Sequence, residues 1–250
     1  MTSWLVEAQG LCPELEIEGG ALPGLTLQIP SQGVHCLLGG RAETREAYLK
    51  ALAGIAWPQA GDLTLFGYSL ADLNTRHLDL LGRQLGYVAR QAPLLSVLNG
   101  RENAVMPAVY HGVQRKQAEQ ALEQVLAELE FDGDLLQLPA FMTPLQRMQL
   151  ALARALLLQP QLLVLEDPWF SLELPDYCIL DQSIRNWGQR LAVLVATDHL
   201  GFVRSNADQI IFIGADECFA FTCWQDLVAS NQPEILDYLQ GYRSAIDWKV

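Results

Sequence analysis

Two glycines, Gly39 and Gly40, stand between an apolar run at residues 34–38 and a stretch with helical spacing at residues 48–53. The apolar run predicts a buried strand and the later stretch a helix, joined through a tight loop. This is the layout of a phosphate-binding loop, whose motif G-x-x-x-x-G-K-[ST] begins at Gly39. In such a loop the backbone N–H groups bind phosphate oxygens, the lysine reaches the terminal phosphates and the hydroxyl binds magnesium.

The three motif positions that carry this chemistry are substituted. Thr44 stands where glycine lets the backbone approach phosphate, and threonine is also a good helix N-cap. Arg45 keeps the positive charge in a broad planar group. Glu46 replaces the hydroxyl with a carboxylate, which near a helix N-terminus interacts favourably with the helix dipole. At about 4 Å, a carboxylate and a phosphate oxygen repel by roughly 4 kcal/mol per unit charge. We therefore expect Glu46 to oppose nucleotide binding, although a strand–turn–helix without a ligand explains this stretch equally well.

The composition is that of a globular protein with excess negative charge. The 250 residues are 50% hydrophobic, which is enough for a sizeable core in one or two closely packed domains. The net charge is −13, which excludes the basic footprint of a nucleic-acid-binding protein. Neither a signal peptide nor a membrane span is recognised, so a cytoplasmic location is expected. The 5 cysteines lack C-x-x-C spacing, which favours buried thiols over disulfides or zinc.

Strands and helices that would position the loop alternate along the chain. Strands are expected at residues 25–30, 34–38, 61–67, 83–88, 162–165, 191–196 and 210–213. Amphipathic patterns predict helices at residues 112–131 and 145–158, within a helical insertion at about residues 92–158. The last three strands are apolar throughout, as a buried parallel sheet requires. A further helix is expected near residues 234–242.

Taken together, these segments resemble the ATPase subunit of ATP-binding-cassette (ABC) transporters over nearly the whole chain. The matching stretches are residues 37–54 for the Walker A strand and helix, 85–91 for the Q-loop, 101–107 for R-E-N-x-x-x-P, 151–160 for the helix after the signature, and 162–168 for Walker B. The resemblance implies one α/β domain over residues 1–250, with a P-loop NTPase-like core, a β-rich N-terminal subdomain and the helical insertion.

The family's nucleotide-contacting positions differ in this chain. No aromatic residue stands at residues 12–15, where the family stacks one on adenine. In the Q-loop, Arg90 occupies the glutamine position and Gln91 follows it. The signature L-S-G-G-Q becomes Met142, Thr143, Pro144, Leu145 and Gln146. Of the two residues that replace the glycines, the proline has no N–H and the leucine is bulky, so both are poor partners for a γ-phosphate.

Two further positions are inverted relative to the family. Walker B Asp-Glu becomes Glu166-Asp167, and the switch His-Asp becomes Asp198-His199. A carboxylate of the wrong length misplaces its oxygens by about 1 Å, which can cost about a hundredfold in rate. Strand alternation would place His199 on the opposite face from Asp198. A solvated strand end and a loop histidine are therefore better interpretations than catalytic residues.

These substitutions together predict a catalytically inactive ABC subunit that acts by binding, with no metal site and no cofactor. The resemblance implies an integral-membrane permease that docks near residues 90–103, a second ATPase subunit in a homodimer or heterodimer, and a peripheral location on the inner face of the membrane. Two alternatives stay open. One is an active ATPase that uses ATP and Mg, with Arg45 on phosphate and Glu166 or Asp167 on magnesium. The other is a soluble regulatory or scaffold protein outside transport.

Two passages are similar to the ATPases of MCE (Mla-type) lipid-transport systems, with lipoprotein-release ATPases second. They are residues 167–173 and residues 229–242, the latter in a C-terminal extension at about residues 225–250. This branch implies lipid transport, and it implies that the extension reaches the partner subunit through Trp248. A terminus docked on its own domain is the equally good alternative for Trp248.

Overall fold

The computed structural model describes residues 4–15, 22–73 and 75–246. The chain forms two compact units, one from residues 1–72 and 194–250 and the other from residues 73–193. The second unit is therefore inserted between two parts of the first, and strand β8 (Ala192–Ala196) contains the boundary. Trp248, a predicted partner contact, lies outside the described residues.

An antiparallel sheet opens the first unit, with strand order β2-β1-β4-β5. Its strands are β1 (Val6–Pro13), β2 (Leu25–Ile29), β4 (Pro58–Leu65) and β5 (Tyr68–Ser69). In β2 the residues alternate strictly between buried and exposed, because one face of the sheet packs on the core and the other faces solvent. The 3-10 helix η1 (Leu70–Asp72) follows β5.

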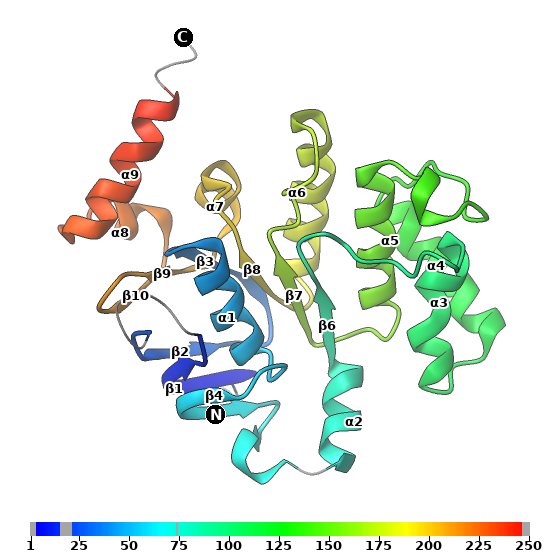
Figure 1. Cartoon of the computed structure of the whole chain (residues 1–250), viewed down its shortest axis with the longest axis horizontal. Helices are drawn as coiled ribbons and strands as arrows, with labels where there is room; N and C mark the ends of the chain where they lie inside the picture. The colour runs from blue at the N-terminus through cyan, green and yellow to red at the C-terminus, as the bar shows by residue number, and fades with distance from the viewer. Residues whose placement is uncertain (1–3, 16–21, 74, 247–250) are drawn as a thin grey trace. The chain divides into compact units, whose positions relative to one another are not determined.

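A second set of strands in the first unit carries the predicted loop. Strand β3 (Gly33–Gly39) pairs in parallel with β9 (Gln209–Ile213), and β10 (Cys218–Phe221) pairs antiparallel to β9. Helix α1 (Ala42–Leu52) follows β3 and contacts both β1 and β3 (Figure 1). The remaining helices of this unit are α7 (Leu200–Asn206), α8 (Trp224–Val228) and α9 (Pro233–Ile246).

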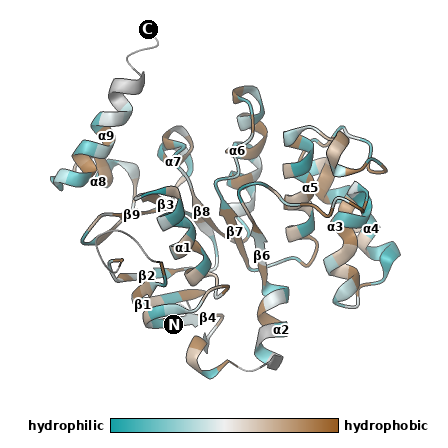
Figure 2. Cartoon of the chain, in the orientation of Figure 1, coloured by the Kyte–Doolittle hydropathy of each residue, from teal (hydrophilic) through white to brown (hydrophobic). Residues whose placement is uncertain are grey.

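The second unit combines two parallel strands with a helical bundle. Strand β6 (Leu85–Val88) pairs with β7 (Leu162–Glu166), whose residues are all buried and whose ribbon is largely hydrophobic in Figure 2. Helices α3 (Gly100–Tyr110), α4 (Arg115–Glu128) and α5 (Pro144–Leu156) pack on one another, within the predicted insertion (Figure 1). The unit also contains α2 (Thr75–Gln84), η2 (Pro139–Phe141) and α6 (Leu174–Gly188).

Most predicted strands and helices are present, and the clearest error is at residues 83–88. The strand begins only at Leu85, because α2 continues to Gln84. The ion pair between Asp79 and Arg83, at 3.5 Å and one helical turn apart, supports the helix there. In the part of the chain that is described, no helix combines the length and apolar character needed to cross a membrane.

Candidate functional site

The loop after β3 is shorter than the phosphate-binding motif predicts. Only Gly40 and Arg41 separate Gly39, at the end of β3, from Ala42, the first residue of α1. The helix is already formed at Arg45, whose backbone N–H donates to the carbonyl oxygen of Arg41 at 3.0 Å. The N–H bonds of the first helical turn all point in one direction, roughly along the helix axis. They therefore do not wrap a phosphate in the way that a longer loop would.

Thr44 and Glu46 consequently both lie inside α1. The predicted N-cap role of Thr44 is wrong, because the helix begins earlier and its N-cap is Arg41. Glu46 is beyond the first turn, so the predicted interaction with the helix dipole is also wrong. Glu46 instead forms an ion pair with Lys50, one helical turn further on.

The packing of β3 against β9 explains the glycine at position 39. Gly39 and Gly40 have φ of 76° and 55°, in the left-handed region that favours glycine. A Cβ atom on Gly39 would lie 2.6 Å from the carbonyl oxygen of Ile213 in β9. The close approach of the neighbouring strand is therefore sufficient to explain this glycine.

The side chain of Arg45 turns back on its own loop. Its Nη1 donates to the carbonyl oxygens of Gly39 at 2.8 Å and Gly40 at 3.0 Å, and its Nη2 donates to Oδ2 of Asp198. The residue is 4% exposed. The only basic group at the lysine position thus binds three oxygen atoms of its own chain.

Asp198 is held in turn by two tyrosines of α9. The hydroxyl of Tyr238 donates to Oδ1 of Asp198 at 3.0 Å, and the hydroxyl of Tyr242 donates to the backbone carbonyl of Asp198. Burial raises the pKa of Tyr238, and the negative charge of Asp198 raises it further. The Tyr238 hydroxyl therefore remains a donor at neutral pH. We call Arg45, Asp198, Tyr238 and Tyr242 the Arg45 network.

His199 does not lie in a strand, so the predicted alternation with Asp198 is wrong. Strand β8 ends at Ala196, and His199 is the N-cap residue of α7. Its backbone N–H donates to Oγ1 of Thr197 at 3.0 Å, and its ring stacks on Phe202 with centroids 6.2 Å apart.

The second unit contains the acidic residues that follow β7. Glu166 is 8% exposed and accepts a hydrogen bond from the hydroxyl of Tyr87 at 3.1 Å, so the interpretation as a solvated strand end is wrong for this residue. Oδ2 of Asp167 lies 3.4 Å from Nε of Arg90. The Arg90 guanidinium also lies over the ring of Phe170, 3.7 Å from its centre, in a cation–π contact. Gln91 is exposed.

The signature position forms the start of α5. Oγ1 of Thr143 accepts from the backbone N–H of Gln146 at 3.2 Å, and Oε1 of Gln146 accepts from the backbone N–H of Thr143 at 3.0 Å. These two bonds are a capping box, and Pro144 and Leu145 occupy the first turn between them. The substituted signature therefore begins a helix with good local chemistry.

The structure thus gathers the predicted residues in separate groups within each unit. The first unit brings Gly39, Gly40 and Arg45 to Asp198, and the second brings Arg90 to Asp167. Sequence reasoning missed Tyr238 and Tyr242, whose spacing of one helical turn is visible in the sequence although their partner is not. It also missed Tyr87 as the partner of Glu166, and the contact of Phe170 with Arg90. Among the described residues, no cluster of three or more His, Cys, Asp or Glu side chains is placed to hold a metal ion.

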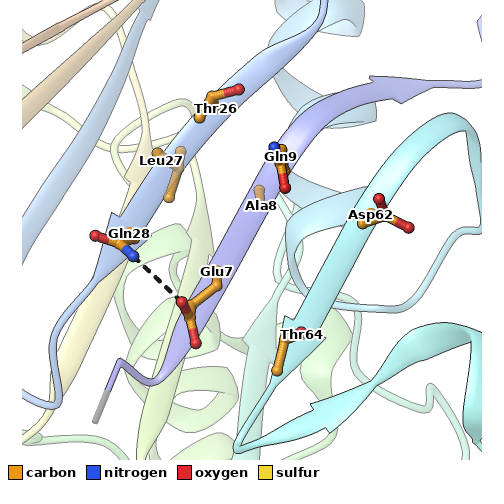
Figure 3. Close-up of a pocket in the computed structure, with 8 residues that line it drawn as sticks. All are labelled: Glu7, Ala8, Gln9, Thr26, Leu27, Gln28, Asp62 and Thr64. Atoms are coloured by element: carbon orange, nitrogen blue, oxygen red, sulfur yellow. Dashed lines mark hydrogen bonds between the residues drawn. The ribbon is translucent and has the colours of Figure 1, made fainter. Parts of the chain in front are cut away.

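A polar hollow on the antiparallel sheet of the first unit is lined by none of the predicted site residues. It measures about 480 Å³ and opens on the solvent face of β1, β2 and β4, as Figure 3 shows. Its polar lining is Glu7, Gln9, Thr26, Gln28, Asp62 and Thr64. Glu7 accepts a hydrogen bond from Gln28 at 3.2 Å. No position singled out in the sequence contributes to this hollow.

Comparisons with known proteins place the fold and these sequence motifs in one family. Residues 22–169, more than half of the chain, match the ABC transporter family profile. The chain therefore belongs to the ABC transporter family. Its structure is similar to the dimeric structure of MJ0796, a bacterial ABC transporter cassette, with a TM-score of 0.77 and 17% identity over 87% of this chain and 98% of that one. The predicted α/β ABC ATPase fold is confirmed.

Individual relatives share about a quarter of the aligned residues. The chain is 24% identical over 223 residues to Mkl of Mycobacterium tuberculosis, a probable ribonucleotide transport ATP-binding protein. It is 26% identical over 171 residues to the sulfate/thiosulfate import ATP-binding protein CysA of Synechocystis, a match that covers 68% of this chain and 46% of that one. The Mkl match covers 88% of this chain and 62% of the relative. The chain thus spans about three fifths of the length of the Mkl relatives.

Proposed function

We propose that this chain is an ATP-binding-cassette subunit of a membrane transport complex that does not hydrolyse ATP and acts by binding its partners. The observation that carries the proposal is the position of Arg45. A residue that clamps phosphate must have its donors directed at the ligand, whereas the donors of Arg45 are directed at Gly39, Gly40 and Asp198. Phosphate binding would require a buried cation to leave three oxygen partners at once.

The acidic residues of the second unit support the same conclusion. Phosphoryl transfer needs a held metal, a cationic clamp and an ordered nucleophile together. Asp167 stands at the position expected to polarise water, but its carboxylate pairs with Arg90. Glu166, at the metal position, accepts from the hydroxyl of Tyr87, a neutral donor that metal binding would displace.

An exposed apolar face supports the permease as the binding partner. Met106, Val109 and Tyr110 have the spacing of one helical face on α3 and are 40%, 37% and 83% exposed. Leu95 and Val97, in the segment before α3, are 46% and 82% exposed. Exposed apolar side chains on one helix face are typical of protein-interaction sites. We propose that a cytoplasmic helix of an integral-membrane permease docks there, which would place the subunit on the inner face of the membrane.

We further propose that the complex transports lipid and that this chain pairs with a second ATPase subunit. Residues 167–173 and the C-terminal extension resemble Mla-type ATPases, which supports lipid as the substrate class and a second ATPase subunit, identical or competent, as the partner. The mycobacterial relative carries a name for ribonucleotide transport instead. Copurification of the full chain with a permease and an intact ATPase would support the mixed pair. A stable protein with no membrane partner would support a scaffold role.

Calorimetric titration of the full-length protein with Mg-ATP tests the central claim. We expect no binding heat at millimolar ATP, and no steady-state turnover with or without the permease. The matched control is the triple variant Thr44→Gly, Arg45→Lys, Glu46→Ser, which restores the motif residues. Submicromolar affinity in the wild type, with turnover abolished by Arg45→Ala and by Glu166→Ala, would overturn the proposal in favour of an active ATPase with rewired motifs.

A further inference from the structure

We propose that α9 is an autoinhibitory strap, in which Tyr238 and Tyr242 hold Asp198 on Arg45 and keep the loop between β3 and α1 closed to phosphate. The inference rests on the proposed function, because it concerns the regulation of the same loop. It concerns only the first unit, which contains all four residues of the Arg45 network.

Asp198 is fixed at three points by protein donors. Arg45 binds Oδ2, Tyr238 binds Oδ1 and Tyr242 binds the backbone carbonyl oxygen. A carboxylate that accepts at both oxygens has a set orientation, whereas one held only by Arg45 could rotate about its side-chain bonds. The two tyrosines therefore decide where the charge of Asp198 is directed.

A second route connects α9 to the loop through aromatic packing. The ring of Tyr238 meets the ring of Phe212 edge to face, with centroids 5.3 Å apart. The Phe212 ring lies 3.0 Å from the position that a Cβ atom on Gly39 would take. One side chain of α9 thus touches both the partner of Arg45 and the residue that packs on the first glycine of the loop.

Helix α9 is attached to the first unit by a small set of contacts besides those of its two tyrosines. Ile235 and Leu239 are buried, and Oε2 of Glu234 accepts from the backbone N–H of Ala215 at 2.9 Å. These contacts lie on neighbouring turns of one helix, joined to α8 by a short segment. Asp198 is 47% exposed at its side chain, so solvent and competing ions reach the network from outside. Displacement of α9 would release Asp198 from both tyrosines and so loosen one of the three oxygen contacts of Arg45.

The test compares the full-length wild type with the double variant Tyr238→Phe, Tyr242→Phe, which removes both hydroxyls and keeps both rings. Hydrogen exchange of the amides at residues 40–45 is the first readout, and binding of inorganic tripolyphosphate by calorimetry is the second. We expect exchange to become roughly tenfold faster, because the local opening equilibrium shifts. We expect tripolyphosphate affinity to rise by roughly tenfold, because a larger fraction of the protein is competent to bind.

Two control variants isolate the network from general effects. Leu236→Ala alters an exposed side chain of α9 outside the network, and Tyr68→Phe removes the hydroxyl of an exposed tyrosine of β5; neither should change either readout. The single variant Tyr238→Phe serves if the double variant does not fold, and it should have the same two effects, each smaller. Loop exchange that is unchanged in the double variant, or faster exchange without gain of tripolyphosphate binding, would overturn the strap. Tight Mg-ATP binding by the wild type would instead overturn the proposed function, which the exchange comparison does not test.

Discussion

Arg45 and Asp198, 153 residues apart in the sequence, form an ion pair in which the arginine side chain is 5% exposed and the aspartate side chain 47%. The same relationship recurs in the other unit, where Arg90 pairs with Asp167 at 3.4 Å. Both arginines stand at positions that contact nucleotide in the family. In this chain, each of them pairs with a carboxylate of its own unit. The substituted positions 45 and 90 thus share one feature, an arginine paired with an aspartate of its own unit.

The ion pair at Arg45 should contribute measurably to stability. Asp198→Asn leaves a buried guanidinium without its charged partner, and we expect the free energy of unfolding to fall by about 1–3 kcal/mol. Because Asp198 is half exposed, solvent screening favours the lower end of this range. Urea denaturation followed by circular dichroism measures the change. Asp62→Asn, at an exposed residue of β4, is the matched control, and an equal effect of the two variants would contradict the prediction.

The cation–π contact between Arg90 and Phe170 should appear as a coupling energy. In a double-mutant cycle with Arg90→Ala and Phe170→Leu, we expect about 0.5–1 kcal/mol of coupling, because both residues are partly exposed. Thermal unfolding of the four proteins provides the measurement. Phe141→Leu, at another exposed phenylalanine, should combine additively with Arg90→Ala. Additivity in the Phe170 cycle as well would mean that the stacking contributes nothing.

The capping box at Thr143 should stabilise α5. Thr143→Ala removes the acceptor for the N–H of Gln146, and we expect a loss of about 0.5–2 kcal/mol in unfolding free energy. Thr143→Ser keeps the hydroxyl and should retain most of the stability. A serine variant as unstable as the alanine variant would show that the threonine methyl group, rather than the cap, is responsible.

Asn103 should hold the segment before α3 in place. It is fully buried, accepts from the N–H of Leu95 at 2.7 Å and donates to the carbonyl oxygens of Leu95, Leu98 and Asn99. Asn103→Ala removes all of these side-chain hydrogen bonds, at a cost of about 1–3 kcal/mol. Hydrogen exchange at residues 95–99 should accelerate more than exchange in α5. Uniform acceleration across the second unit would indicate global destabilisation instead.

His35 should make stability depend on pH in the mildly acidic range. Burial lowers its pKa, although contacts with Gln209, the carbonyl oxygen of Gln32 and the charge of Asp208 act in the opposite direction. The folded state therefore binds a proton less readily than the unfolded state, whose histidine has a pKa of about 6.5. The contribution of His35 to the free energy of unfolding should be fully present above about pH 6.5. It should be lost as the pH falls from there toward the lowered pKa of the folded state.

The His35→Gln variant isolates this contribution. Its unfolding free energy should depend less steeply on pH than that of the wild type below about pH 6.5. Urea titrations of both proteins at a series of pH values provide the comparison, and the other histidines are common to both. Parallel curves would exclude His35 as the source of the dependence.

Local sequence patterns were sufficient to predict most of the strands and the protein family. The alternation in β2 and the apolar runs of β3, β7 and β9 are visible in the sequence because burial on one or both faces of a strand imposes a fixed period. The order of motif-like segments indicated an ABC ATPase fold, which the comparisons confirm. The capping box at Thr143 was also readable, as the pattern T-x-x-Q before an apolar helix.

The sequence by itself therefore determined the family, the order of the central strands and helices and the substitutions at the loop that begins at Gly39. Only the tertiary structure decided what those substitutions do. Whether α1 begins at Ala42 or after Thr44 depends on the packing of the loop against β9, which no short window of sequence contains. The partner of Arg45 comes from the turn after β8 and is held by α9, and spacing along the chain carries no information about contacts between such distant segments. A charge in the sequence is free to bind a ligand only if the fold leaves it without a partner, and here the fold supplies one.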